Sequence, residues 1–274
     1  MSTKKTEDWV ATVTIQSSGA YNVGERLRFM SDTISGSIKR MSGDGVILFP
    51  GGWLNAEQKP ASSLYNQAEK TVTEALKSAG NRKIFVVFGI DGSDSADQIA
   101  VAIDKKGIQA IGRKFYPIDD ERDYLKAAKS YDVQESGKSR VFELNKRKFF
   151  MAVCYDIFGI KHKNLPNKFK ANVILNLVHR FDREEFSGFT QYARHGFAGA
   201  SNHWHCPVFG TAVFFEQKIP VKWPTGVYWD QGSTRQSECN YKNITIPAFK
   251  KIKGRTKEGE FIIRFYHFDK YLLS

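Results

Sequence analysis

The sequence predicts an α/β fold with a mixed sheet, and three observations lead to this class. Apolar runs such as 46–49, 84–88 and 173–178 are typical of strands buried on both faces. Segments with helical spacing of apolar residues lie between the early strands, as in a layered α/β domain. The stretches 99–111 and 141–154 each indicate two strands joined by a turn, so antiparallel hairpins extend the sheet.

The spacing of apolar residues predicts each element of the first part of the chain. Residues 9–15 alternate between two faces, as in a strand. Residues 27–41 and 64–79 repeat their apolar positions every three or four residues, as in amphipathic helices. Gly80 is a typical residue at the end of a helix. Strand and helix therefore alternate up to the strand over 84–88.

Later elements follow the same logic. Residues 208–215 and 261–268 predict two further strands. Asp182 and Glu185 resemble a capping box that opens a helix over 186–200. These elements continue the layered pattern after the hairpins.

One domain accounts for the chain. No composition shift or linker divides it, so residues 1–274 are expected to form a single domain. The segment 217–250 is rich in Pro, Gly, Asn and Trp and is expected to be an irregular surface excursion. Hydrophobic residues at 41% and charged residues at 26% match globular usage and exclude a mainly disordered chain or a fibre.

The sequence also indicates the cellular compartment. No apolar run is long enough for a spanning helix, and the N-terminal residues lack the apolar core of a signal peptide. Three widely spaced cysteines do not form a disulfide framework. We therefore expect a cytoplasmic protein that does not enter a membrane.

The net charge of +12 is unusual and opens an alternative. A basic protein attracts nucleic acid or anionic substrates. The longest basic run is only Lys146-Arg147-Lys148, at a hairpin turn, and no arginine-rich tail or aromatic RNA-binding motif is present. Nucleic-acid binding is therefore an alternative rather than the main expectation.

Cys154 and Lys114 are the sharpest candidates for chemistry. Ligands of α/β sheets bind beyond the carboxyl ends of strands, and both residues follow predicted strands. A thiolate at Cys154 could attack an acyl or nitrile carbon. Lys114 could stabilise the thiolate or an oxyanion. The alternatives are an inert core cysteine and an exposed lysine.

Three segments extend this interpretation. VILFPGGW at 46–53, GRKFYP at 112–117 and VFELNKRKFFMAVCYD at 141–156 occur in an order that resembles the nitrilase superfamily of carbon–nitrogen hydrolases. The last segment, a hairpin that leads into Cys154, is the most specific. The resemblance extends with lower similarity from about 10 to 215.

The resemblance implies a four-layer αββα sandwich and a Glu-Lys-Cys triad. Lys114 matches the lysine of the triad and Cys154 its nucleophile. Glu121 resembles a second glutamate that many members place near the nucleophile, and Asn202 resembles a late asparagine near the site.

One position departs from the superfamily pattern. A glutamate that acts as general base usually follows the strand-ending proline, whereas Gly51 follows Pro50 here. Glycine has no proton acceptor, so it cannot activate a cysteine or a water. Glu57 or Glu121 would have to supply the base. Otherwise the chain has the fold without the full chemistry.

Further residues are expected in the wall of the substrate pocket. Gly51, Trp53 and Tyr155 flank the expected triad positions. His179 and Arg180 follow the strand over 173–178, where an arginine could bind a substrate carboxylate. Asn202 joins this set through the resemblance.

A metal centre is an alternative for the cluster around His203 and His205. These two residues, with Cys206 and Cys239, have the residue types of metal ligands. Structural zinc sites usually show tighter paired spacing. We therefore expect a polar wall and no metal.

The expected function is that of an amidase-like carbon–nitrogen hydrolase. A small amide or nitrile would form a thioester on Cys154, Lys114 would stabilise the oxyanion, and Glu121 would orient Lys114 or act as base. This chemistry needs no metal or organic cofactor, and the resemblance implies a homo-oligomer. The alternatives are a binding or regulatory module that has lost hydrolysis through Gly51, and a basic nucleic-acid-binding protein.

Overall fold

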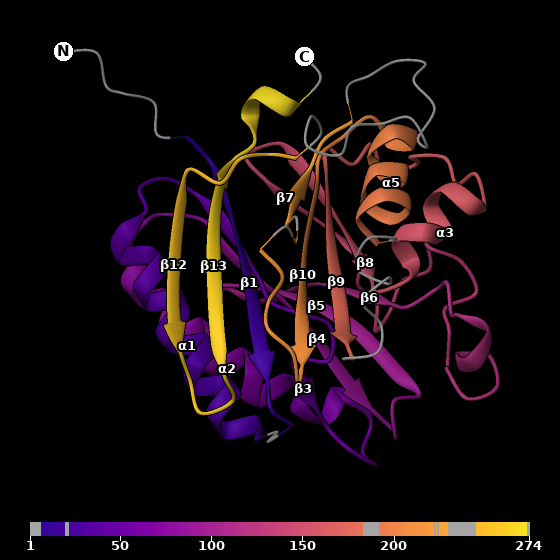
Figure 1. The fold of residues 1–274 in the computed structure, drawn as a ribbon, viewed down its shortest axis with the longest axis horizontal. Helices are drawn as coiled ribbons and strands as arrows, with labels where there is room; N and C mark the ends of the chain where they lie inside the picture. Colours follow the sequence, from indigo (N-terminus) through magenta and orange to yellow (C-terminus); the bar gives the residue numbers. More distant parts are fainter. Residues whose placement is uncertain are drawn as a thin grey trace.

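The computed structural model describes residues 7–19, 22–182, 192–221, 223, 225–229 and 245–272. Strands run through the centre of this part of the chain, and helices flank them (Figure 1). None of the described helices is both long and apolar enough to cross a membrane.

Thirteen strands within these residues form one continuous sheet. They are β1 (Trp9–Ser17), β2 (Gly45–Leu48), β3 (Leu54–Asn55), β4 (Ile84–Gly92), β5 (Asp97–Asp104), β6 (Gly107–Arg113), β7 (Val141–Leu144), β8 (Arg147–Val153), β9 (Val173–Phe181), β10 (Val208–Phe215), β11 (Gly226–Val227), β12 (Lys250–Arg255) and β13 (Glu260–His267). The main order is β6-β5-β4-β2-β1-β10-β9-β8-β7.

The sheet is mixed. Its centre is parallel, from β4 through β2, β1, β10 and β9 to β8. The hairpins β4-β5-β6 and β7-β8 add antiparallel strands at the two ends, and β13 pairs antiparallel with β1. The parallel centre brings the carboxyl ends of several strands to one edge, which is where reactive side chains of such folds gather.

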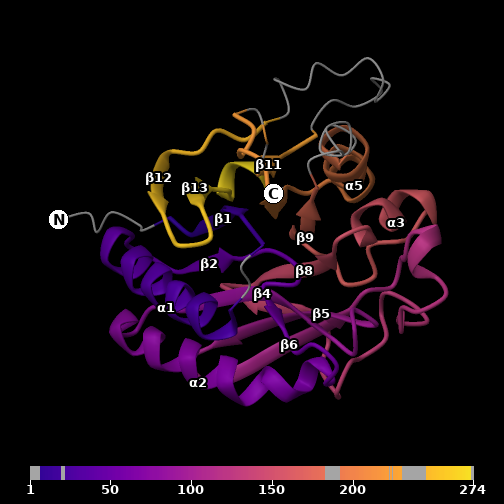
Figure 2. The same cartoon turned by 60° about the horizontal axis from the view of Figure 1, so that its bottom comes forward.

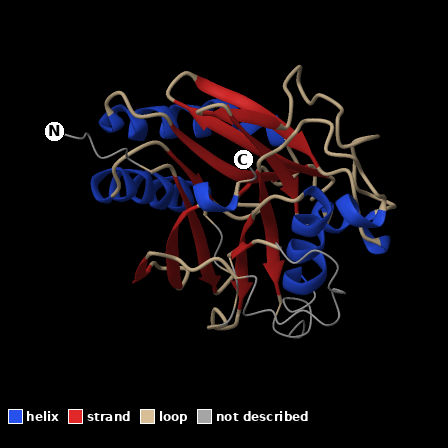
Figure 3. Cartoon of the chain, turned by 90° about the horizontal axis from the view of Figure 1, so that it is seen from above, coloured by secondary structure: helices blue, strands red, loops and turns tan. Residues whose placement is uncertain are grey.

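Helices cover the two outer faces of the folded sheet. Figure 2 shows α1 (Val23–Arg40) and α2 (Tyr65–Leu76) along one side and α3 (Asp156–His162) and α5 (Ala198–Trp204) on the other. The sheet seen from above lies between these two groups of helices (Figure 3). The layers are therefore helix, sheet, sheet and helix.

Two hydrophobic cores separate the layers. Ile47 and Val86 belong to the core beneath α1 and α2. Their neighbours Val46 and Phe85 point to the opposite face and belong to the core shared with β8 and β9. Alternation along a strand therefore serves both cores, which is why these strands read as unbroken apolar runs.

The start of α1 shows how the sequence sets an element. The Asn22 side chain accepts a hydrogen bond from the Glu25 backbone N–H at 3.0 Å, which caps the helix. Met30, Ile34 and Ile38 then repeat on the buried face. The predicted amphipathic spacing is confirmed, and the helix begins four residues before the predicted range.

The structure contains the predicted strands and both predicted hairpins. Periodicity did not predict the short strand β3, the helix α3 or the strand β12. The capping box at Asp182 and Glu185 lies partly outside the described residues, because the description stops at 182 and resumes at 192. From there the chain forms a π-helical turn, η4 (Tyr192–Phe197), followed by α5.

The segment 217–250 is not a surface excursion throughout, which corrects that expectation. Trp223, Val227 and Trp229 are buried, and β11 pairs with β10. Trp223 packs against the ring of Phe214, because large aromatic side chains gain most from burial. Residues 230–244 lie outside the described part of the chain.

Candidate active site

The carboxyl ends of β1, β2, β4, β8, β9 and β10 meet around one cavity of about 710 Å³, and the loop after β6 also lines it. Its lining includes the sequence candidates Gly51, Glu121, Cys154, Tyr155, His179 and Arg180. Lys114 lies behind this surface and is fully buried. These strand ends bring together residues that are far apart in the sequence.

Cys154 occupies a tight turn between β8 and α3. Its φ angle of 50° lies in the left-handed region, which costs a residue with a side chain some strain. The Cys154 backbone N–H donates to the Leu177 carbonyl at 2.9 Å, and its carbonyl accepts from Asn176 Nδ2 at 2.9 Å. These bonds to β9 fix the turn and direct the thiol to the cavity.

Asp156 ties the Cys154 turn to the Lys114 loop. Its Oδ1 accepts hydrogen bonds from the backbone N–H groups of Phe115 and Tyr116, each at 2.8 Å. Its Oδ2 accepts from the Val153 N–H at 3.0 Å and from Arg140 Nη1 at 3.2 Å. Both charged side chains are fully buried. One carboxylate therefore sets the distance between the candidate cation and the candidate nucleophile.

Lys114 and Glu121 form a close ion pair. The Lys114 ammonium donates to both carboxylate oxygens of Glu121, at 2.6 and 2.5 Å, and to Gln98 Oε1 at 3.0 Å. Glu121 also accepts from Gln98 Nε2 and the Ile118 N–H. Glu121 therefore holds Lys114 in place.

The charges of this pair are stable at neutral pH. Although burial alone would lower the pKa of Lys114, the Cys154 sulfur and the Glu121 carboxylate raise it. Burial alone would raise the pKa of Glu121, but Lys114 lowers it. A charged lysine beside the thiol favours the thiolate.

His179 is a second polar group that acts on Cys154. Its Nε2 is 2.9 Å from Asp91 Oδ1. Since a carboxylate only accepts, Nε2 carries a hydrogen. Burial alone would lower the pKa of His179, but Asp91 and then Cys154 raise it to about 10.

Cys154 has the properties of a reactive thiol. Burial alone would raise its pKa, but Lys114 and His179 lower the pKa of Cys154 to about 7. Tyr192 Oη lies 3.0 Å from the sulfur. Burial keeps the pKa of Tyr192 well above its usual value, so its neutral hydroxyl can donate to the thiolate. The site therefore stabilises negative charge on sulfur from three directions.

Two sequence candidates do not line this cavity, which corrects their expected roles. Asn202 is half-buried on α5, which packs on the outer face of the sheet. Trp53 is fully buried but lies on the α1 side of the turn. The left-handed backbone of Gly52, with φ of 55°, reverses the chain and turns Trp53 away from Cys154. Glu57 is exposed outside the cavity, so it does not replace the missing base there.

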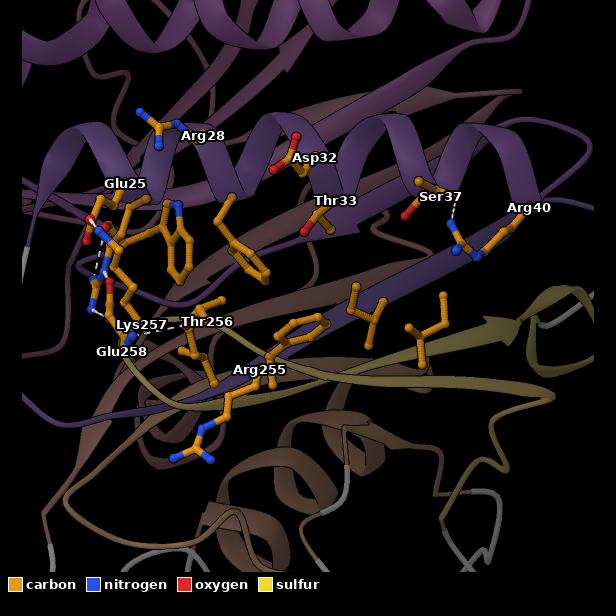
Figure 4. A pocket seen from close by; sticks show the side chains of 18 residues that line it. Glu25, Arg28, Asp32, Thr33, Ser37, Arg40, Arg255, Thr256, Lys257 and Glu258 are labelled. Carbon is orange, nitrogen blue, oxygen red and sulfur yellow. Dashed lines mark hydrogen bonds and ion pairs between the residues drawn. The ribbon is translucent and has the colours of Figure 1, made fainter.

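Trp53 instead lines a separate cavity of about 420 Å³ between α1 and the β12–β13 hairpin (Figure 4). Arg26 lies 4.9 Å from the centre of the Trp53 ring and pairs with Glu258 at 2.8 Å. Arg26 lines both cavities, so this ion pair forms part of the wall between them.

The histidine cluster does not form a metal centre in the described residues, where no group of three or more His, Cys, Asp or Glu side chains could hold an ion. His203 Nε2 lies 2.9 Å from the Leu165 carbonyl. His205 is exposed, and burial raises the pKa of Cys206. Cys239 lies outside the described residues.

Sequence reasoning missed Asp91, Tyr192, Gln98 and Asp156. Asp91 follows the predicted strand 84–88 by three residues, so extending β4 through Gly92 would have placed it at the sheet edge. Asp156 is the last residue of the segment 141–156, and nothing in that segment indicates the four hydrogen bonds that it accepts. Nothing in the local sequence distinguishes Tyr192 from other aromatic residues of the predicted helix 186–200.

Comparison with solved structures identifies proteins that share this fold. Neither a protein-family model nor a curated protein matches the chain. A double mutant of the amidase from Nesterenkonia sp. AN1, solved in complex with acrylamide, has a TM-score of 0.63 at 10% identity, and the match covers 97% of this chain and 92% of that one.

Two more structures of that amidase agree. A mutant described as belonging to the nitrilase superfamily has a TM-score of 0.59 at 10% identity, covering 98% of this chain and 94% of that one. A mutant with the acetamide moiety of fluoroacetamide added covalently at the active-site cysteine has a TM-score of 0.58 at 11% identity, with the same coverages. At such identities the likeness shows the fold. The chain therefore has the layered, mixed α/β fold of these nitrilase-superfamily amidases.

Proposed function

We propose that the protein is an amidase-like carbon–nitrogen hydrolase that acts on a small amide or nitrile through a thioester on Cys154. One observation carries the proposal: a cysteine in a strained turn opens to a cavity and lies beside a buried lysine that favours its thiolate. Thiolates attack acyl carbons. A mutant of the amidase with the same fold shows covalent addition of the acetamide moiety of fluoroacetamide at its active-site cysteine, so a cysteine of that fold can act as a nucleophile.

Lys114 would stabilise the tetrahedral intermediate. Its ammonium is buried and fixed by Glu121 and Gln98, so its positive charge is already in place when negative charge develops on the substrate oxygen. Glu121 would act through Lys114 as a positioning residue. Tyr155 and Arg180 line the same cavity and would contact the rest of the substrate.

The absence of a carboxylate at Gly51 favours one alternative, a binding module that has lost hydrolysis. The two functions differ in whether a covalent adduct forms. A binding module would be stabilised by small amides without releasing ammonia. A homo-oligomeric, cytoplasmic protein that needs no cofactor remains the prediction from the sequence, with nucleic-acid binding as the less favoured alternative.

The test combines turnover with intact mass. Wild-type protein is incubated with acetamide, propionamide, butyramide and the matching nitriles, and ammonia release and acyl adducts are measured. Adducts are expected on the wild type and on Cys206→Ala, a buried cysteine outside the cavity, but not on Cys154→Ala. A folded wild type that gives neither ammonia nor an adduct with any of these compounds would overturn the proposal.

A further inference from the structure

We propose that His179, positioned by Asp91, is the proton donor and acceptor for Cys154. This inference rests on the proposed hydrolase function and assigns the missing base of that reaction. It makes the centre a cysteine–histidine–aspartate arrangement with a lysine beside it. The inference rests on the close packing of the His179 imidazole and the Asp91 carboxylate against the glycines at positions 51 and 52.

The imidazole occupies the space that a side chain at position 51 would need. A Cβ placed on Gly51 would lie 2.8 Å from His179 Nδ1 and 2.6 Å from the Leu177 carbonyl oxygen. Neither separation is compatible with a real side chain. The position of the His179 ring therefore requires a glycine at position 51. The chain has a titratable ring against this position, where it has no carboxylate.

Neighbouring glycines let the strands come close enough to seat the pair. A Cβ on Gly52 would lie 2.7 Å from Asp91 Oδ2, and one on Gly89 would lie 2.5 Å from the Gly51 Cα. The Gly51 N–H donates to the Val178 carbonyl at 3.0 Å, so this turn is bound to β9 as well as packed on β4. The turn thus lies between the strands that carry Asp91 and His179.

The two ring nitrogens of His179 have different surroundings. Nε2 is bonded to Asp91, whereas Nδ1 is buried and has no hydrogen-bond partner among the described residues. The Cys154 thiol lines the same cavity as the ring and raises the pKa of His179. A buried polar atom without a conventional partner is costly, so a role in proton exchange with the thiol explains why it is retained.

The electrostatic surroundings support a thiolate beside an imidazolium. Other titratable or charged side chains around the cavity are Arg26, Lys114, Glu121, Tyr124, Tyr155, Arg180 and Tyr192. Cys154 has a pKa of about 7 and His179 one of about 10, so the pair is charged between these values. The Asp91 carboxylate stabilises the imidazolium on its far side.

The reaction balances with these groups alone. The Cys154 thiolate attacks the amide carbon, and the tetrahedral oxyanion collapses as the C–N bond breaks and the Nδ1 proton moves to the leaving nitrogen. Ammonia leaves, and a thioester and a neutral imidazole remain. Nδ1 then takes a proton from water while the hydroxide adds to the thioester carbon. The C–S bond breaks, and the carboxylic acid, the thiolate and the imidazolium are formed.

Glu121 is less suited to this role. Both its oxygens are bonded to Lys114, and further bonds from Gln98 and the Ile118 N–H occupy them. Lys114 lowers the pKa of Glu121, and this makes it a weaker base. If His179 is the base, His179→Asn should stop the reaction at the thioester. If Glu121 is the base, Glu121→Gln should do so.

The first experiment does not depend on turnover. The rate of Cys154 alkylation by iodoacetamide is measured against pH in wild type, His179→Asn and Asp91→Asn. The wild-type rate should rise around pH 7. In both variants the midpoint should move upward by at least about one pH unit, because the thiolate loses its cationic partner. His203→Asn removes a histidine that bonds outside the cavity and should leave the profile unchanged.

The second experiment separates acylation from deacylation with p-nitrophenyl acetate at pH 9. Its leaving group needs no proton, so His179→Asn should release about one equivalent of nitrophenol in a burst. In the wild-type thioester the acylated sulfur no longer raises the pKa of His179, so the imidazole can release its proton to solvent and act as base. Hydrolysis of the thioester of His179→Asn should then be about 100- to 10,000-fold slower, as expected when a general base is removed. Glu121→Gln, which loosens Lys114, should slow the whole reaction without accumulating the thioester, and Cys154→Ala should show no burst.

The outcomes distinguish the two proposals. Superimposed alkylation profiles for wild type and His179→Asn, or a stall in Glu121→Gln but not in His179→Asn, would overturn the role of His179 while leaving Cys154 as nucleophile. Absence of adducts and turnover in wild type would overturn the hydrolase. In that case a shifted alkylation midpoint in His179→Asn would still support the ion pair between the two residues.

Discussion

The two sides of Cys154 are built in different ways. On one side Lys114 and Glu121 are seven residues apart in the chain and form a buried ion pair. On the other side His179 and Asp91 are 88 residues apart and meet because β9 and β4 both pack against the turn at Gly51. The first side supplies a fixed positive charge, and the second supplies a group that can exchange a proton.

If the proposed mechanism holds, this contrast explains how the site works without an acidic residue at position 51. A general base must lie within reach of the nucleophile and must titrate, but its position in the sequence is free. Position 51 has no side chain, and the imidazole of His179, which belongs to another strand, lies where a Cβ at this position would be. The lysine side has no such substitute, because a buried ammonium needs its own carboxylate.

The largest effect is expected for Asp156→Ala, which disconnects Lys114 from Cys154. Removing this carboxylate leaves Arg140 buried without its ionic partner and frees three backbone N–H groups. Breaking a buried pair typically costs about 3–5 kcal/mol. We expect urea denaturation to show a loss of this size, together with loss of activity.

The control for this prediction is Asp119→Ala, which removes an exposed ion pair with Arg122. Exposed pairs contribute about 0–1 kcal/mol, so this variant should unfold at nearly the wild-type urea concentration. Equal stability of the two variants would show that Asp156 does not hold the site together.

The next effect is expected for Lys114→Met. Loss of the cation removes the proposed oxyanion donor, and such losses reduce kcat by about 100- to 1,000-fold. The pKa of Cys154 should also rise, because Lys114 is the strongest influence that lowers it. Amide turnover and the alkylation profile would measure both effects.

A matched variant separates charge from stability in this prediction. Lys114→Met leaves the Glu121 carboxylate without its partner, whereas Lys114→Met/Glu121→Gln removes both charges. The double variant should recover stability but not activity. Recovery of activity as well would mean that Lys114 acts only by neutralising Glu121.

Much of the fold could be predicted from the sequence because both cores are built from strands that are apolar on two faces. Unbroken apolar runs such as 46–49 and 84–88 can be recognised as buried strands without knowing which strands lie beside them. The helix α1 could also be predicted, because its buried residues recur at helical spacing. The helix α3 was missed because its seven residues are mostly buried on all sides, so no period separates its faces. The buried tryptophans of 217–250 were missed because turn-forming residues surround them.

The site was predictable to the extent that its residues follow strands. Cys154, Lys114 and Glu121 were found through their motifs, and His179 was found as a residue at a strand end, but with a different role. Its pairing with Asp91 depends on which strands lie side by side, and one sequence does not give that order. The contact between Tyr192 and Cys154 joins two segments that are 38 residues apart, and the sequence alone does not indicate it.

A smaller effect is expected for Gly51→Ala, which tests the crowding around the imidazole. The new methyl group would press on His179 Nδ1 and on the Leu177 carbonyl, so the ring must move away from Cys154. A displacement of about 1 Å at a reacting group can cost up to about 100-fold in rate. Activity and unfolding are measured together.

Gly80→Ala is a suitable comparison for Gly51→Ala. No atom lies within 4 Å of a Cβ at Gly80, although its φ of 62° makes that variant strained. Gly80→Ala should therefore lose stability and keep its rate, whereas Gly51→Ala should lose rate. Full activity in Gly51→Ala would show that the imidazole does not fill the space at position 51.

The smallest effect is expected for Tyr192→Phe, which removes only the hydroxyl 3.0 Å from the Cys154 sulfur. A hydroxyl that donates to the thiolate stabilises the charged form, so its loss should raise the midpoint of iodoacetamide alkylation. The shift should stay below about one pH unit, because a hydrogen bond contributes about 1 kcal/mol and one pKa unit corresponds to about 1.4 kcal/mol. The variant should therefore react more slowly near pH 7 and equally fast near pH 9, where both thiols are ionised. Tyr131→Phe, whose hydroxyl donates to the Pro166 carbonyl away from the cavity, should reproduce the wild-type profile. A shift in Tyr192→Phe as large as that in His179→Asn would mean that the phenol, and not the imidazole, is the main partner of the thiolate.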